Sequence, residues 1–211
     1  MALALMVDGG LLALFALQHS IMARPWFKRA WTRVVPEPAE RSTYVLFSSV
    51  AMFLMFGQWQ PIGAVVWNVG DGVLSAVMIG LYAAGLLIVL LSTFLINHFD
   101  LFGLRQVWRH VRGEPQQGLK FVLPVLYRIV RHPLYVGWFF AFWCTPTMTV
   151  THLVFAVMTT AYILIAIQFE ERDLVHEHPE YADYRRRVPM LIPFLRGRGS
   201  ASPGTGATAH S

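Results

Sequence analysis

The sequence predicts an all-α, polytopic integral membrane protein with five transmembrane helices. The first observation is composition: hydrophobic residues make up 55% of the 211-residue chain and charged residues only 14%, whereas a water-soluble domain carries about 25% charged residues. The second is that the apolar residues fall into five separate runs, and the third is that every Lys and Arg lies between or after them. We expect one membrane-embedded domain over residues 1–195. The small polar residues of 196–211 predict a disordered tail.

The five apolar runs cover residues 3–22, 43–60, 73–96, 134–145 and 150–169. The first and third are long enough for the hydrocarbon core of a bilayer, which needs about 20 helical residues. The second is slightly short, so we expect it to extend toward Val66. Only residues 145–149 separate the last two runs, which predicts a helical hairpin with Pro146 in its turn. A cytoplasmic helical segment is expected after the fifth run.

The positive charges predict the orientation of the chain. Loop 23–42 holds five Lys and Arg residues, loop 97–132 holds six and the segment after residue 169 holds six, which together are all 17 in the chain. Because cytoplasmic loops carry an excess of Lys and Arg, the N-terminus should lie outside the cell (inner) membrane and the C-terminus in the cytoplasm. This pattern also explains the net charge of +5, so we expect a lipid bilayer and no nucleic acid as partner.

The segment RHPLYVG, residues 131–137, joins a basic loop to the fourth apolar run. Pro133 fits the first turn of a helix, where its missing N–H costs nothing. The free N–H groups and partial positive charge of a helix start suit an anionic group, and Arg131 adds a charge-assisted partner. Gly137 lets another helix or a flat ligand approach closely. Basic anchoring combined with small-residue helix packing explains the same residues equally well.

Two carboxylates, Glu170 and Glu171, stand at the membrane exit of the fifth run. Ionisable groups at that depth usually have a partner or a function. His176 and His178 follow closely, but residues two positions apart point to different sides of a helix. With a single cysteine, Cys144, we expect no metal site.

Three polar residues, Asn97, His98 and Asp100, close the third run. A helix C-terminus favours cations, so a carboxylate is unfavourable there unless it has a partner. We interpret Asp100, assisted by His98, as a candidate catalytic group. The alternative is that Asp100 caps the helix or pairs with a loop arginine such as Arg105.

Gln18 and His19 lie near the inner end of the first run. A histidine in this position can serve a substrate or a catalytic step. It can equally be a hydrogen-bonded packing residue, which is the commoner case.

The segment RHPLYVG, the Glu170–Glu171 pair and the segment YADYRRRVP, residues 181–189, occur in an order that resembles the isoprenylcysteine carboxyl methyltransferase superfamily. In that superfamily these segments enclose S-adenosyl-L-methionine at the cytoplasmic face. The resemblance implies a cofactor-binding set of Arg131, His132, Pro133, Tyr135, Gly137, Glu170, Glu171 and Tyr184. This chain departs from many relatives at His178–Pro179 and at Met190, so the superfamily's prenyl or lipid acceptor does not carry over directly.

The N-terminal half is similar to the bacterial methanethiol S-methyltransferases in LQHSIMARPWFK (17–28), PAERSTYVLFSS (38–49) and INHFDLFGLRQ (96–106). This resemblance implies S-adenosyl-L-methionine-dependent methylation of methanethiol to dimethyl sulfide. For the reaction that it implies, we expect Asp100 and His98 to handle the thiol proton, and Gln18, His19, Asn97 and Phe99 to bind the substrate.

Two alternatives to a small thiol remain open at this stage. The first is methylation of a lipid or isoprenyl-thiol acceptor at the same cofactor site, which needs a lateral opening between helices. The second is a non-enzymatic membrane protein, such as the denitrification-associated relatives of similar topology, which would bind no cofactor.

Overall fold

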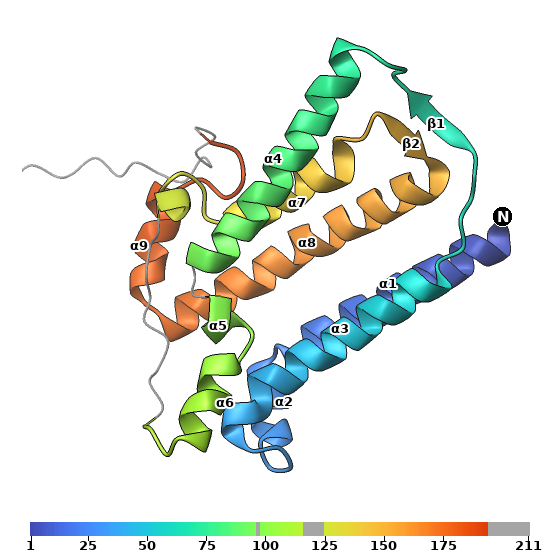
Figure 1. Cartoon of the computed structure of the whole chain (residues 1–211). Helices are drawn as coiled ribbons and strands as arrows, with labels where there is room; N and C mark the ends of the chain where they lie inside the picture. Colours follow the sequence, from blue (N-terminus) through green and yellow to red (C-terminus); the bar gives the residue numbers. More distant parts are fainter. Residues whose placement is uncertain (96–97, 116–124, 194–211) are drawn as a thin grey trace, which may run out of the picture.

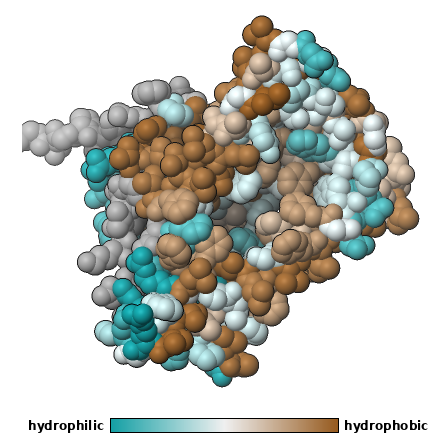
Figure 2. All heavy atoms as spheres, in the orientation of Figure 1, coloured by the Kyte–Doolittle hydropathy of each residue, from teal (hydrophilic) through white to brown (hydrophobic). Residues whose placement is uncertain are grey.

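The computed structural model describes residues 1–95, 98–115 and 125–193. Asn97 and the predicted tail over 196–211 therefore lie outside the described residues. The described chain consists of helices and one short two-stranded ribbon (Figure 1). Hydrophobic side chains cover much of the surface in view in Figure 2.

Two long helices from the N-terminal half, α1 (Ala2–Met22) and α3 (Glu40–Gln58), lie side by side (Figure 1). Between them the chain forms α2 (Pro25–Trp31) and the 3-10 helix η1 (Glu37–Ala39). Pro25 opens α2 because a proline at the first helical position loses no hydrogen bond. The α1–α3 pair forms one wall of the molecule.

The second half packs α4 (Val73–Leu95) closely against α7 (Pro133–Trp143). A Cβ atom on Gly137 would lie 2.6 Å from the carbonyl oxygen of Gly85 and 2.8 Å from Val89 Cγ2. The two helices can therefore approach this closely only because both contact positions are glycine, which is how small residues build helix contacts in membranes.

The longest helix, α8 (Val150–Glu177), contacts both α7 and α1 and so joins the two halves. It is followed by α9 (Glu180–Arg187). The short elements α5 (His98–Leu101), α6 (Leu104–Val111) and η2 (Val125–Arg128) complete the described chain. Figure 1 shows α2, α6 and α9, which carry basic residues, at one end of the molecule, with the N-terminus and the ribbon at the other.

The strands β1 (Val65–Asn68) and β2 (Thr147–Thr149) pair antiparallel and correct two predictions. The second apolar run does not extend toward Val66 as a helix, because α3 ends at Gln58 and the chain continues to a strand. Pro61 and the β-branched Val65 and Val66 disfavour helix there. The turn before α8 is likewise not a simple proline turn, since Thr147–Thr149 pair with β1. The fold is therefore helical with a small ribbon rather than purely all-α.

Three helices, Ala2–Met22, Val73–Leu95 and Val150–Glu177, are long and apolar enough to cross a membrane. They indicate a membrane protein. By contrast α7 has 11 residues, so it rises about 16 Å at 1.5 Å per residue, roughly half of a hydrocarbon core. The five-span topology and its orientation therefore stay predictions.

Candidate functional site

A buried ion-pair network at the start of α7 is centred on Glu171. Arg131 donates from Nε to Glu171 Oε1 at 2.6 Å and from Nη2 to Oε2 at 3.2 Å. His132 Nε2 lies 2.9 Å from Glu171 Oε1. The three side chains are only 11%, 5% and 7% exposed for Arg131, His132 and Glu171. Because a buried carboxylate is costly unless it is paired and hydrogen-bonded, this geometry makes Glu171 a structural anchor.

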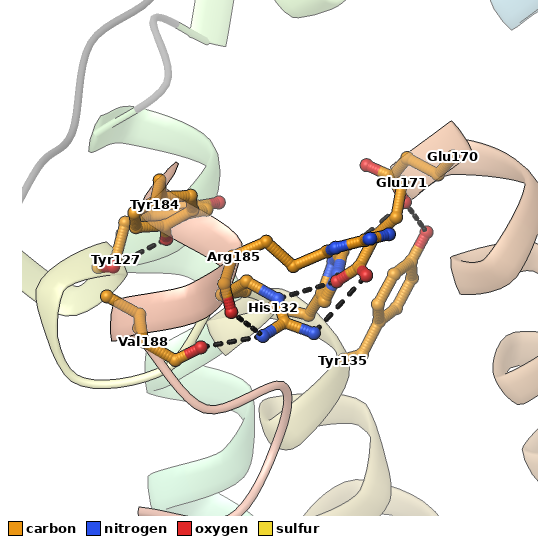
Figure 3. A network of polar contacts seen from close by, with 9 residues as sticks. Tyr127, His132, Tyr135, Glu170, Glu171, Tyr184, Arg185 and Val188 are labelled. Atoms are coloured by element: carbon orange, nitrogen blue, oxygen red, sulfur yellow. Dashed lines mark hydrogen bonds and ion pairs between the residues drawn. The ribbon is translucent and has the colours of Figure 1, made fainter. Parts of the chain in front are cut away.

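The same network holds the segment after α9 against α7. Arg131 Nη1 donates to the carbonyl oxygens of Arg185 at 2.9 Å and Val188 at 2.6 Å. The backbone N–H of Arg131 donates to the carbonyl oxygen of Pro189 at 2.9 Å, and that of His132 donates to the carbonyl oxygen of Met190 at 3.2 Å. Figure 3 shows the carbonyl oxygens of Arg185 and Val188 directed at a guanidinium beside His132. The Arg131 guanidinium is thus engaged within the chain, a role that its sequence position did not predict.

Glu170, next to the anchor, is bound differently. Its Oε2 accepts a hydrogen bond from Tyr135 Oη at 3.1 Å (Figure 3), and His132 Nδ1 lies 4.0 Å away. The Glu170 side chain is 44% exposed. A carboxylate has about four lone-pair sites, so Glu170 retains acceptor capacity that Glu171 has used.

Tyrosines from several elements surround Glu170. Its carboxylate interacts electrostatically with Tyr44 of α3, Tyr127 of η2, Tyr135 of α7 and Tyr181 of α9. Aromatic faces and a carboxylate both attract cations. The arrangement can therefore receive a positively charged group of a ligand.

Tyr184 fixes the loop before α7 to α9. Its hydroxyl donates to the carbonyl oxygen of Tyr127 at 2.5 Å, and its ring packs edge-on against Tyr181 at 5.3 Å between centroids. Burial raises the pKa of Tyr184 to about 12, so the phenol keeps its proton and donates at neutral pH. This predicted cofactor-binding residue therefore shapes the site wall.

Two further predicted residues are placed by the start of α7. Pro133 occupies the first turn of α7, as the sequence predicted, and it is buried. Gly137 faces α4 through Gly85 and Val89. Of the two partners that the sequence left open for Gly137, another helix or a flat ligand, the structure gives the helix.

A second polar cluster lies where α1, α3 and α8 meet. The Tyr44 hydroxyl is 2.8 Å from His19 Nε2 and 2.9 Å from Nδ1, and Ser48 Oγ is 3.3 Å from Nδ1. The His19 ring stacks on Phe15 at 5.4 Å and meets Tyr162 edge-on at 6.5 Å. His19 is therefore hydrogen-bonded, with only hydroxyl groups as its described hydrogen-bond partners.

Tyrosines connect the two clusters. Tyr44 interacts electrostatically with Tyr162 and Glu170, and Tyr135 with both Tyr44 and Tyr162. Figure 2 shows the surface hollowed between α8 and the α1–α3 pair. His19 of α1 faces α8, the helix that carries Glu170, through its edge-on contact with Tyr162. Sequence reasoning missed Tyr44 and its neighbour Ser48, although their spacing of four residues on a predicted helix places them on one face.

Gln18, which was predicted beside His19, donates from Nε2 to Met22 Sδ at 3.1 Å. Its Oε1 is buried and has no hydrogen-bond partner among the described residues. That oxygen can accept a hydrogen bond from a donor group of a ligand.

The predicted catalytic pair lies in α5. Asp100 is paired with Arg105, with 3.2 Å between Oδ2 and Nη1, and its side chain is 14% exposed. This is the contact that the non-catalytic alternative requires. The His98 ring stacks on Phe94 and packs against Phe102, each at 4.7 Å between centroids, and its Nδ1 has no hydrogen-bond partner in the described part of the chain. Phe99 is 55% exposed.

Known proteins resemble this chain over most of its length. It is 61% identical over 193 residues to a methanethiol S-methyltransferase of Crocosphaera subtropica, an alignment that covers 91% of this chain and 76% of the relative. It is 52% identical over 192 residues to the enzyme of that name from Mycobacterium tuberculosis, with 90% and 79% covered. Human Nurim is 32% identical over 195 residues, with 87% and 72% covered. No protein-family model and no solved structure matches the chain.

Proposed function

The chain belongs to the methanethiol S-methyltransferase family, and from that membership we propose that it is an enzyme that methylates methanethiol to dimethyl sulfide with S-adenosyl-L-methionine as donor. One structural observation carries the proposal furthest. A rigid ion-pair network holds Glu171, while the adjacent Glu170 keeps a half-exposed carboxylate among tyrosines.

The residues around Glu170 fit the chemistry of the donor. S-adenosyl-L-methionine supplies a methyl carbon on a positively charged sulfur and also carries an ammonium group. Glu170 has acceptor capacity left after its bond with Tyr135, and the tyrosine rings favour a nearby cation. We propose that Glu170 and Tyr135 contact a cationic group of the donor, while Arg131, His132 and Glu171 keep these residues in place.

The surroundings suit the loss of charge during the reaction. The thiolate is the reactive form of a thiol, and its reaction with a cationic sulfur compound gives two neutral products. Such a step is faster where water is excluded, provided that the charged partners are brought together. Tyr181 and Tyr184 are 3% and 4% exposed, so they seal the side of the site formed by α9.

We propose that this site opens to the cytoplasm, with five spans in the inner membrane. The support is the position of the basic segments α2, α6 and α9, which lie at the end of the molecule where α8 leads into α9 (Figure 1). The short α7 fits this topology if it starts inside the membrane rather than at its surface. Pro133, its first residue, is buried, and the backbone N–H of the preceding, buried His132 is bonded to the segment after α9.

The test is methyl transfer by the purified protein. Methyl-labelled S-adenosyl-L-methionine is supplied with methanethiol or with an isoprenyl thiol, and labelled volatile product is measured in the headspace. We expect labelled dimethyl sulfide from methanethiol. Label recovered only in the isoprenyl product would contradict the proposed acceptor, and no transfer to either thiol by protein that remains folded would contradict an enzymatic function.

A further inference from the structure

The inference concerns the proton of the thiol, and it rests on the proposed function. A neutral thiol must lose its proton to become the nucleophile. A positioned base of suitable strength assists such a step by about 10²–10⁴-fold. The sequence puts forward three imidazole or carboxylate groups for this role, namely His98, Asp100 and His19.

Two of these groups are poorly placed to receive a proton. The Asp100 carboxylate is paired with Arg105, with 3.2 Å between Oδ2 and Nη1, so part of its hydrogen-bonding capacity is already used. His98 lies against the rings of Phe94, Phe99 and Phe102, with its Nδ1 buried. These contacts give a packing explanation for both residues.

The geometry points to His19 as the group that accepts the thiol proton, with Tyr44 and Ser48 as positioning residues. Both partners of the imidazole are hydroxyl groups. A hydroxyl is able to donate or accept, so neither partner has to leave when the ring gains a proton. The neutral ring donates from one nitrogen and accepts at the other, whereas the protonated ring donates from both.

The position of His19 also fits the proposed donor site. The His19 ring meets Tyr162 of α8 edge-on at 6.5 Å between centroids, and Glu170 lies about two helical turns further along that helix. The buried Gln18 Oε1 lies one residue away in sequence and lacks a described partner. Because Gln18 and His19 are consecutive residues of α1, their side chains point about 100° apart, and His19 alone is assigned the thiol proton.

The groups that face His19 come from all three packed helices. Tyr44 and Ser48 belong to α3, Phe15 to α1 and Tyr162 to α8. Arg24, which follows α1, is paired with Asp173 of α8, with 3.0 Å between Arg24 Nη1 and Asp173 Oδ2. His19 consequently has no carboxylate among its described hydrogen-bond partners, and hydroxyl positions rather than an ion pair set its orientation.

In the proposed step the S–H bond of the thiol breaks and its proton bonds to the oxygen of the hydroxyl, Tyr44 or Ser48, that donates to the unprotonated ring nitrogen of His19. That hydroxyl's own proton moves onto the ring nitrogen. The electron pair left on the thiol sulfur forms the new bond to the methyl carbon. The old carbon–sulfur bond breaks with its electron pair returning to the donor sulfur. Imidazolium then passes the proton to water, which restores the neutral ring.

The experiment compares His19→Gln with His152→Gln in the full chain. His152 lies in the first turn of α8, next to the ribbon, with 2.9 Å between its Nε2 and the carbonyl oxygen of Phe142. We expect His19→Gln to lower kcat for methanethiol by roughly 10²–10⁴-fold at pH 7, with His152→Gln near the parent rate. The deficit should shrink as the pH rises, and also with an acidic thiol such as trifluoroethanethiol, because both supply thiolate without a base.

Binding of S-adenosyl-L-methionine, measured by calorimetry, should be unchanged in His19→Gln. An equal loss of rate with neutral and acidic thiols would overturn the inference, as would a rate within a few-fold of the parent. If His19→Gln does not fold, Tyr44→Phe replaces it, and a pH profile identical to the parent's would then overturn the role of the pair. Failure of the parent to methylate any thiol would instead contradict the proposed function.

Discussion

Replacing Glu171 by glutamine removes the negative charge that holds Arg131 and His132 at the start of α7. The guanidinium of Arg131 would keep its bonds to the carbonyl oxygens of Arg185 and Val188, but its charge would be left buried without a counter-ion. Removing one partner of a buried ion pair costs about 3–5 kcal/mol. For a chain of this size 1 kcal/mol moves the unfolding midpoint by about 2–4 °C. We therefore predict that Glu171→Gln lowers the midpoint by at least roughly 6 °C.

Glu170→Gln is the matched control, since the same chemical change is made one residue away. The Glu170 side chain is 44% exposed and has one hydrogen bond, to Tyr135. An exposed or half-exposed charge contributes only about 0–1 kcal/mol to stability, so its unfolding midpoint should change little. If Glu170 contacts a cationic group of the donor, losing a charged hydrogen bond of about 1.5–3 kcal/mol weakens binding by roughly 10- to 100-fold.

Both variants are measured in detergent by thermal unfolding and by calorimetric titration with S-adenosyl-L-methionine. The expected result is a separation: Glu171→Gln loses stability, and Glu170→Gln loses affinity at near-parent stability. Equal destabilisation by the two variants would refute the assignment of Glu171 as the anchor. Parent-like affinity in Glu170→Gln would refute the proposed contact with the donor.

Three further predictions concern a helix contact, an ion pair and the orientation of the chain. Gly137→Ala should destabilise the protein by about 1–3 kcal/mol because the added methyl group meets Gly85 and Val89. Gly10→Ala is the control and should not destabilise it, since its methyl group meets nothing within 4 Å. Equal unfolding midpoints of the two variants would disprove the tight α4–α7 contact. Asp100→Asn should reduce stability through loss of the Arg105 pair but keep turnover per folded molecule within a few-fold, and a loss of about 10² or more would return the catalytic role to Asp100. Reporter fusions should place the C-terminus in the cytoplasm and residue 70 outside, and the opposite pattern would reject the proposed topology.

Some elements of the fold were predictable because they depend on local composition. The five apolar runs each correspond to a helix, with bounds that agree within a few residues except that α8 continues to Glu177. Pro133 was placed at a helix start by its missing N–H, and the structure confirms it. The β1–β2 ribbon was missed, because its strands are short and lie about 80 residues apart in the chain, and pairing at that separation leaves no local pattern.

The sequence also pointed to Glu170, Glu171 and His19 as candidate site residues, but it did not predict which residues would contact them. Glu170 and Glu171 are neighbours on one helix, so their side chains point about 100° apart. Which of them is buried depends on how α8 is rotated against α7, and that rotation is set by contacts between segments distant in sequence. Arg131 and Glu171 are 40 residues apart, and His19 and Ser48 are 29 apart.

Residue types and their spacing thus determined that the chain is a helical membrane protein, that its positive charges lie between and after the apolar runs, and where its ionisable groups cluster along the chain. Only the tertiary structure decided that Glu171 is neutralised while Glu170 remains open, that Gly137 receives a helix, and that Asp100 is paired with Arg105. The physical reason is that hydrophobicity and charge act residue by residue, whereas the surroundings of a buried polar group are made by whichever helices pack around it.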